Sequence, residues 1–299
     1  MNDWCVPSWR SSDRRECLAL STSPPLTFAL NHMAAPQLAL ADFFALARSL
    51  GISGVEIRND IAGKAILDGT PASAVKALAA QHDVSIISIN ALQKFNHWSA
   101  ERAAEAEILA DYVVACGSQA LVLVAANDGT RLSSAAERIG NATQSLIGLQ
   151  PVLAARGLIG LVECLGFEAC SLRSKREASA AMTAADPTHE TFRLTHDTFH
   201  HHLAGEDEIF PHLTGLIHIS GVDDPAIAVS DMRDSHRVLV GPADRLGNIA
   251  QVAALRAGGY AGPLSFEPFA EELRTLADPA AAIRQSIDFV VDGLKVRAA

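Results

Sequence analysis

Residues 158–163 read LIGLVE, a short apolar run that ends in a glutamate. Three later runs are of the same kind: FRLTHD at 192–197, GLIHIS at 215–220 and PLSFE at 263–267. Short apolar runs between turn signals are typical of strands that are buried on both faces. Each run therefore predicts a buried strand, and each carries an ionisable side chain at or near its carboxyl end.

The same rhythm extends back to the start of the chain. Further strands are predicted at residues 27–31, 54–58, 84–90 and 120–125. Helical spacing and helix-end signals predict helices at 38–50, 71–81, 100–116, 133–155, 174–184, 206–212, 248–257 and 279–296. Eight strand–helix units at ~34 residues each predict an α/β fold, a closed (β/α)8 TIM barrel.

The alternative fold is an open doubly wound sheet, which usually has a glycine-rich turn after its first strand. Here residues 31–36 read NHMAAP, and neither GxGxxG nor GxxxxGK[ST] occurs in the chain, so no nucleotide cofactor is expected. We predict one barrel domain at 26–299, preceded by an extension at 1–25 that is flexible or loosely docked. The longest irregular stretch, 222–247, follows the seventh strand, and loops of this length in compact domains are usually functional.

Composition excludes several classes of protein. Hydrophobic residues make up 49% of the 299 residues and charged residues 19%, which is a globular composition. The 24 basic and 34 acidic side chains leave a net charge of −10, which argues against binding to nucleic acid or to an anionic membrane surface. The five cysteines form no CxxC pair, so we expect reduced thiols and a cytoplasmic location. Composition does not fix the oligomeric state, and a homo-oligomer is compatible with it.

The late strands indicate where the chemistry lies. In a barrel the active site lies at the carboxyl ends of the strands, where this chain has Glu163, Asp197, His218 and Glu267. One such residue alone could be an isolated polar group, but four in register are expected to converge. Three converging carboxylates would repel each other, and a divalent cation removes that cost. Oxygen and imidazole ligands suit zinc, manganese, cobalt or magnesium alike.

Several segments resemble a known superfamily. They are LVE (161–163), HDTFH (196–200), GLIHI (215–219), DSHR (234–237) and SFEPF (265–269). They resemble the sugar isomerases and epimerases with xylose-isomerase-like barrels, a group that includes inosose isomerases, inosose dehydratases, hydroxypyruvate isomerases and ketose 3-epimerases. The resemblance runs from Leu26 to the C-terminus and implies carbohydrate metabolism, with inositol catabolism as the setting for an inosose.

The resemblance also implies residue roles. Glu163, Asp197, His218 and Glu267 would ligate one divalent metal ion, and the two glutamates would be the catalytic acid/base groups. The histidine of the DTFH segment, His200, would hold a substrate oxygen, and Arg237 would close over the substrate. Relatives usually continue with Pro-Gly-x-Gly, whereas residues 240–243 read VGPA here, which leaves the reach of Arg237 open.

Weaker signals come from polar residues that end the early strands. Asn90 and Asn127 suit a hydroxylated ligand, although residues of this type also cap loops. Arg58 is expected to pair with a local carboxylate. Asp234 and His236 could extend the site to a second metal, and Cys164 is expected to point away from Glu163 as a buried thiol.

The function predicted from these residues is isomerisation or epimerisation of a small keto-polyol, an inosose or a ketose, through an enediolate. A metal-dependent dehydratase of an inosose-like substrate is the alternative, since it begins with the same proton removal. A non-catalytic sugar-binding protein is a weaker one. A nuclease of the endonuclease IV type would need more strand-end histidines and a basic groove, which the net charge opposes.

Overall fold

The computed structural model describes residues 25–61, 66, 68–129 and 134–298. Apart from Pro25, the predicted N-terminal extension lies outside the described residues. No helix within these described ranges is both long enough and apolar enough to cross a membrane.

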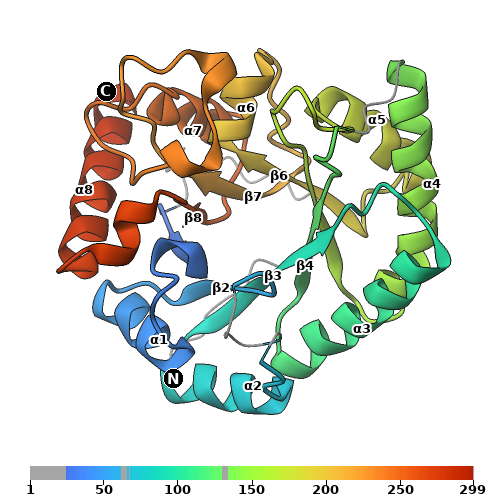
Figure 1. The fold of residues 1–299 in the computed structure, drawn as a ribbon, viewed down its shortest axis with the longest axis horizontal. Coiled ribbons are helices and arrows are strands. Elements are labelled where there is room, and N and C mark those ends of the chain that lie inside the picture. Colours follow the sequence, from blue (N-terminus) through green and yellow to red (C-terminus); the bar gives the residue numbers. More distant parts are fainter. Residues whose placement is uncertain (1–24, 62–65, 67, 130–133, 299) are drawn as a thin grey trace, which may run out of the picture.

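Eight parallel strands close into a barrel in chain order, with β1 paired to both β2 and β8 (Figure 1). The strands are β1 (Phe28–Asn31), β2 (Gly54–Arg58), β3 (Ser85–Gln93), β4 (Ala120–Val124), β5 (Ile159–Glu163), β6 (Phe192–Asp197), β7 (Thr214–Ile219) and β8 (Leu264–Phe266). The predicted (β/α)8 barrel and its single domain are confirmed. The third strand is longer than predicted and continues past Asn90.

Helices form the outer layer around the strands (Figure 1). They are α1 (Leu40–Ser49), α2 (Ala72–Gln81), α3 (Ala100–Cys116), α4 (Ala135–Ala154), α5 (Lys175–Ala185), α6 (Thr198–Ala204), α7 (Asn248–Ala257) and α8 (Pro279–Ala298). The main apolar core lies between this layer and the strands. A small apolar cluster that includes Val122, Leu161 and Leu216 forms separately from that core.

The prediction of a helix at 206–212 is wrong, because the sixth helix begins directly after β6. Asp197 ends the strand and caps this helix, since its Oδ1 accepts hydrogen bonds from the backbone N–H groups of Phe199 (2.7 Å) and His200 (3.0 Å). Gly205, with φ +63°, ends the helix. Glu206 instead accepts bonds from the backbone N–H groups of α5, and so it caps a different helix.

The long stretch at 222–247 is an ordered cover, orange in Figure 1. It contains two short 3₁₀ turns, Val229–Asp231 and Asp234–His236. Its buried Val222, Met232 and Leu246 pack against Phe199 and Leu203 of α6. This packing fixes the segment that carries Arg237.

Candidate metal centre

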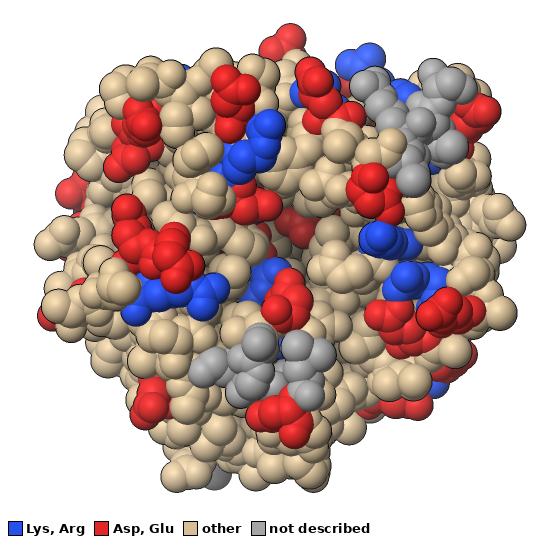
Figure 2. All heavy atoms as spheres, viewed as in Figure 1, with Lys and Arg blue, Asp and Glu red and all other residues tan. Residues whose placement is uncertain are grey.

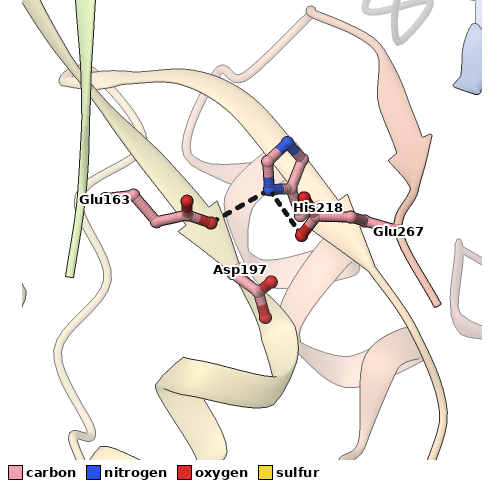
Figure 3. A group of neighbouring side chains, drawn as sticks. All are labelled: Glu163, Asp197, His218 and Glu267. Carbon is pink, nitrogen blue, oxygen red and sulfur yellow. Dashed lines mark hydrogen bonds and ion pairs between the residues drawn. The ribbon is translucent and has the colours of Figure 1, made fainter. Parts of the chain in front are cut away.

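The four predicted strand-end residues meet inside the barrel. Glu163 ends β5, Asp197 ends β6, His218 is the last residue but one of β7, and Glu267 directly follows β8. All four are buried, and one ligand atom from each lies within 4.8 Å of those from the others. Their side chains point toward a common centre, with Glu163 and Glu267 on opposing sides (Figure 3).

His218 lies between three buried carboxylates. Its Nδ1 lies 3.0 Å from Glu163 Oε1 and 3.2 Å from Glu267 Oε2. Its Nε2 lies 3.2 Å from the carboxylate of Glu56. Burial alone would lower the pKa of His218, but the three carboxylates raise it well above its ordinary value.

The two glutamates of the cluster differ in proton affinity. Burial is the main cause of a raised pKa at Glu163, and the charges of Glu267 and Asp197 raise it further, so the pKa stays above its ordinary value although His218 lowers it. Burial would also raise the pKa of Glu267, but His218, Arg237 and Arg58 hold it well below its ordinary value. One closely packed group therefore contains a carboxyl that favours the proton and a carboxylate that releases it.

Arg237 reaches the cluster although the residues after it differ from the pattern of the resembled superfamily. It is only 1% exposed. Its NH2 donates to Asp197 Oδ2 at 2.5 Å and to Glu267 Oε2 at 3.1 Å. Its guanidinium also lies 5.0 Å from the ring centre of Phe199 and 4.5 Å from that of Phe269. The covering segment thus brings one positive charge onto two acidic side chains.

The other predicted substrate residues lie at three different places. His200 is buried against Phe167, with ring centres 5.2 Å apart, and its Nδ1 has no hydrogen-bond partner among the described residues. Asn90 is buried and donates to the carboxylate of Glu56 at 2.9 Å. Asn127 is exposed at the rim of a cavity whose lining does not include Asn90.

A cavity of about 670 Å³ is lined by the segment after β5 and by the covering segment, and the four cluster residues are not among its lining residues. Asn127 and Phe167 are among its lining residues, together with Arg233 and Asp234 of the covering segment. Asp234 connects it to the cluster, because its Oδ1 accepts a bond from Arg237 NH1 at 3.2 Å. Figure 2 shows a hollow near the middle of this face, with acidic side chains visible inside it.

Three further residues with weaker sequence signals have partners in the structure. Arg58 pairs with Asp60, as expected, and its NH1 also donates to Glu267 Oε1 at 2.6 Å. Asp234 pairs with Arg237, and within the part of the chain that the structure describes the four-residue cluster is the one group of three or more metal-type ligands. Cys164 is buried, with its Sγ 3.4 Å from the Ser174 carbonyl oxygen.

Sequence reasoning missed Glu56, which lies in the middle of β2 and is 0% exposed. Burial would raise its pKa, but the charge and the hydrogen bond of His218 lower it overall. A signal was present: residues 54–58 read GVEIR, and a carboxylate in the middle of an otherwise apolar strand needs buried partners. Those partners come from four other strands, which no local pattern reveals.

The donor set fits a divalent cation. Three carboxylates and one imidazole gather at one buried point, and like charges held this close are stable only with positive charge among them. Oxygen and nitrogen donors of this kind are found around zinc, manganese, cobalt and magnesium. The side chains therefore fit a metal without selecting one.

Comparisons with known proteins agree with this architecture. The chain is 31% identical to a xylose isomerase domain containing protein from Salmonella typhimurium LT2, whose structure superposes with a TM-score of 0.81 over 92% of this chain and 100% of that one. The IolI protein with a bound zinc atom is 19% identical, and its structure superposes with a TM-score of 0.80 over 91% of this chain and 99% of that one. An L-ribulose 3-epimerase is 18% identical, with a TM-score of 0.69 over 92% of this chain and 96% of that one.

A search of curated proteins found no match. Residues 44–292 match the model of one protein family, described as the xylose isomerase-like TIM barrel. This match spans most of the chain, including all four residues of the cluster. The chain therefore belongs to the family of xylose isomerase-like TIM barrels.

Proposed function

We propose that this protein is a divalent-metal-dependent isomerase or epimerase of a small keto-polyol, either an inosose or a ketose. The observation that carries the proposal is the pair Glu163 and Glu267, which approach one buried point from opposing sides beside Asp197 and His218 (Figure 3). Proton transfer next to a carbonyl needs an acid and a base on the two sides of the reacting carbons. This pair offers both.

Glu163, Asp197, His218 and Glu267 would hold the metal ion, which would supply Lewis-acid stabilisation of the substrate oxygen that gains negative charge. One glutamate takes the proton from the carbon next to the carbonyl, which leaves an enediolate. A proton then returns to the adjacent carbon in an isomerase, or to the opposite face of the same carbon in an epimerase. Arg237 and His200 would orient substrate oxygens, and burial keeps bulk water from competing for the proton.

A neutral, hydroxylated substrate suits the adjoining cavity. Its charged lining residues balance, with Arg173 and Arg233 against Glu168 and Asp234. Asn127 at the rim adds an amide that can bond to hydroxyl groups. An inosose is the preferred substrate, since the sequence resembles inosose isomerases.

The deciding experiment is proton exchange in D₂O. The metal-loaded protein is incubated with an inosose and with several ketoses, and NMR follows deuterium entering the carbon beside the carbonyl as the isomer forms. We expect exchange with at least one substrate. We also expect its loss in Glu163→Gln and Glu267→Gln, both of which keep an amide oxygen and should retain the metal.

The outcomes separate the competing functions. Formation of an enone absorbance with loss of water would replace the isomerase with the dehydratase. Binding of a keto-polyol without any exchange, in protein shown by metal analysis to be loaded, would refute catalysis and leave a sugar-binding protein.

A further inference from the structure

We propose that Glu56 is a positioning residue that holds the imidazole of His218 so that its Nδ1 faces the metal centre. This inference rests on the proposed metal-dependent function. It assigns Glu56 no contact with substrate or with the ion, and its effect passes through His218 alone.

The geometry divides the two nitrogens of His218 between two tasks. Nδ1 faces Glu163 and Glu267, at 3.0 and 3.2 Å. Nε2 faces the carboxylate of Glu56 at 3.2 Å. The four-residue group whose ligand atoms lie within 4.8 Å of one another does not include Glu56. Glu56 therefore contacts the ring on its other nitrogen, outside the ligand set.

Glu56 is itself held from several sides. Its carboxylate accepts hydrogen bonds from Ser88 Oγ at 2.5 Å and Asn90 Nδ2 at 2.9 Å on β3, from Asn31 Nδ2 at 3.4 Å on β1, and from Ser265 Oγ on β8. A carboxylate with donors from three strands has a fixed position and little acceptor capacity left for a substrate. Such a group suits orientation of a neighbour better than acid/base work.

The contact has a direct chemical consequence for metal binding. An imidazole that ligates through Nδ1 must carry its proton on Nε2, and a fixed acceptor at Nε2 selects this tautomer and ring orientation. Without that acceptor, the ring has no preference between its two nitrogens, and its buried N–H is left unpaired. Loss of such a partner typically weakens metal affinity by about 10–100-fold.

The test measures zinc affinity directly in the full chain by competition with a chromophoric chelator. Glu56→Gln keeps the shape of the side chain, but its amide can donate to Nε2 and so favour the other tautomer. We expect zinc to bind about 10–100-fold more weakly. In ¹⁵N NMR of the zinc-loaded protein, we expect the Nε2–H signal of His218 to shift, because this proton loses its carboxylate acceptor. Neither readout requires a substrate.

Two further variants make the result decisive. Glu177→Gln alters a glutamate paired with Arg138 outside the barrel and should leave zinc affinity and the His218 signals unchanged. Ser88→Ala with Ser265→Ala keeps the Glu56 carboxylate but removes two of its donors, and should weaken zinc binding by a few-fold even if Glu56→Gln does not fold.

The outcomes distinguish this inference from the proposed function. Zinc affinity within twofold of wild type in Glu56→Gln, or in the serine double variant, with unchanged His218 signals, would overturn the role of Glu56 and leave the proposed function standing. Failure of the wild-type chain to bind zinc, manganese, cobalt or magnesium would instead overturn the proposed function itself.

Discussion

Two buried histidines on neighbouring strands have opposite proton affinities. His218 of β7 faces into the barrel among carboxylates, which raise its pKa well above the ordinary value. His196 of β6 contacts Gln251 of α7, in the outer layer, and burial beside Lys175 lowers its pKa well below that value. In the parallel register Asp197 is the partner of His218, so the two histidines differ by one residue of register.

The difference shows that the face of a strand decides what a buried imidazole does. Gln251 donates its amide protons to the carbonyl oxygens of Thr198 and Leu246, so its Oε1 accepts the Nε2–H of His196. The Nδ1 atoms of His196 and His201 have no hydrogen-bond partner among the described residues. These outward imidazoles stay neutral, and their rings pack against each other. The inward imidazole of His218 instead faces carboxylates, two of which belong to the proposed metal ligands.

The largest expected effect is the loss of the inward histidine. His218→Gln should abolish stoichiometric metal binding and lower kcat/KM by about 10³-fold, the scale expected when one preorganised group at a reacting centre is removed. His196→Gln keeps a polar group beside Gln251 and should retain metal and activity within about threefold of wild type. Metal analysis and steady-state kinetics check both variants. Equal losses in the two would contradict the different roles of His218 and His196.

The next effect concerns the charge that covers the inward cluster. Arg237→Met leaves Asp197 without its buried partner, so the free energy of unfolding of the metal-free protein should fall by about 3–5 kcal/mol. The control is Arg48→Met, which breaks an exposed pair with Asp83 and should cost about 1 kcal/mol or less. Urea unfolding compares the two. Similar losses of free energy in the two variants would mean that the buried pair of Arg237 contributes no more to stability than the exposed pair of Arg48.

The two faces should also respond to pH with opposite signs. The pKa of His201 is lowered to about 4 and that of His196 is lowered well below 6.5, so both contribute stability that is present above pH 6.5 and lost as pH falls toward 4. His218, whose folded pKa is raised, contributes stability that is present below pH 6.5 and lost only as pH rises through that raised value.

Replacing the outward pair tests this sign. His196→Gln with His201→Gln should lose less stability than wild type between pH 6.5 and 4.5, as measured by urea unfolding at several pH values. The groups that act on His201 are Lys175, Glu206 and His202, all of which stay in place. If the free energy of unfolding depends on pH in the same way in the variant and in wild type, protonation of these two imidazoles is not the cause of the stability lost in acid.

Sequence patterns predicted the barrel and its four converging residues for one physical reason. In a parallel barrel the carboxyl end of every strand lies at the same mouth, so a local pattern is enough to place Glu163 or Glu267. The same logic fails for Glu56 in mid-strand, because its partners come from distant strands. It fails for α6 because Asp197 ends a strand and caps a helix at once. It also does not place Arg237, which only the resemblance of the DSHR segment indicated, because the segment that carries Arg237 has no periodicity.

The smallest expected effect separates the two asparagines that were predicted to bind substrate. Asn90 donates to the buried carboxylate of Glu56, so Asn90→Ala should lower the free energy of unfolding by about 1–3 kcal/mol, the cost of a lost partner for a buried polar group. Asn127 is exposed at the rim, so Asn127→Ala should leave stability unchanged and raise KM by about threefold at most, with kcat constant. A large loss of kcat in Asn127→Ala would mean that the rim moves inward when substrate binds, and that the division between inward and outward groups holds only for the free protein.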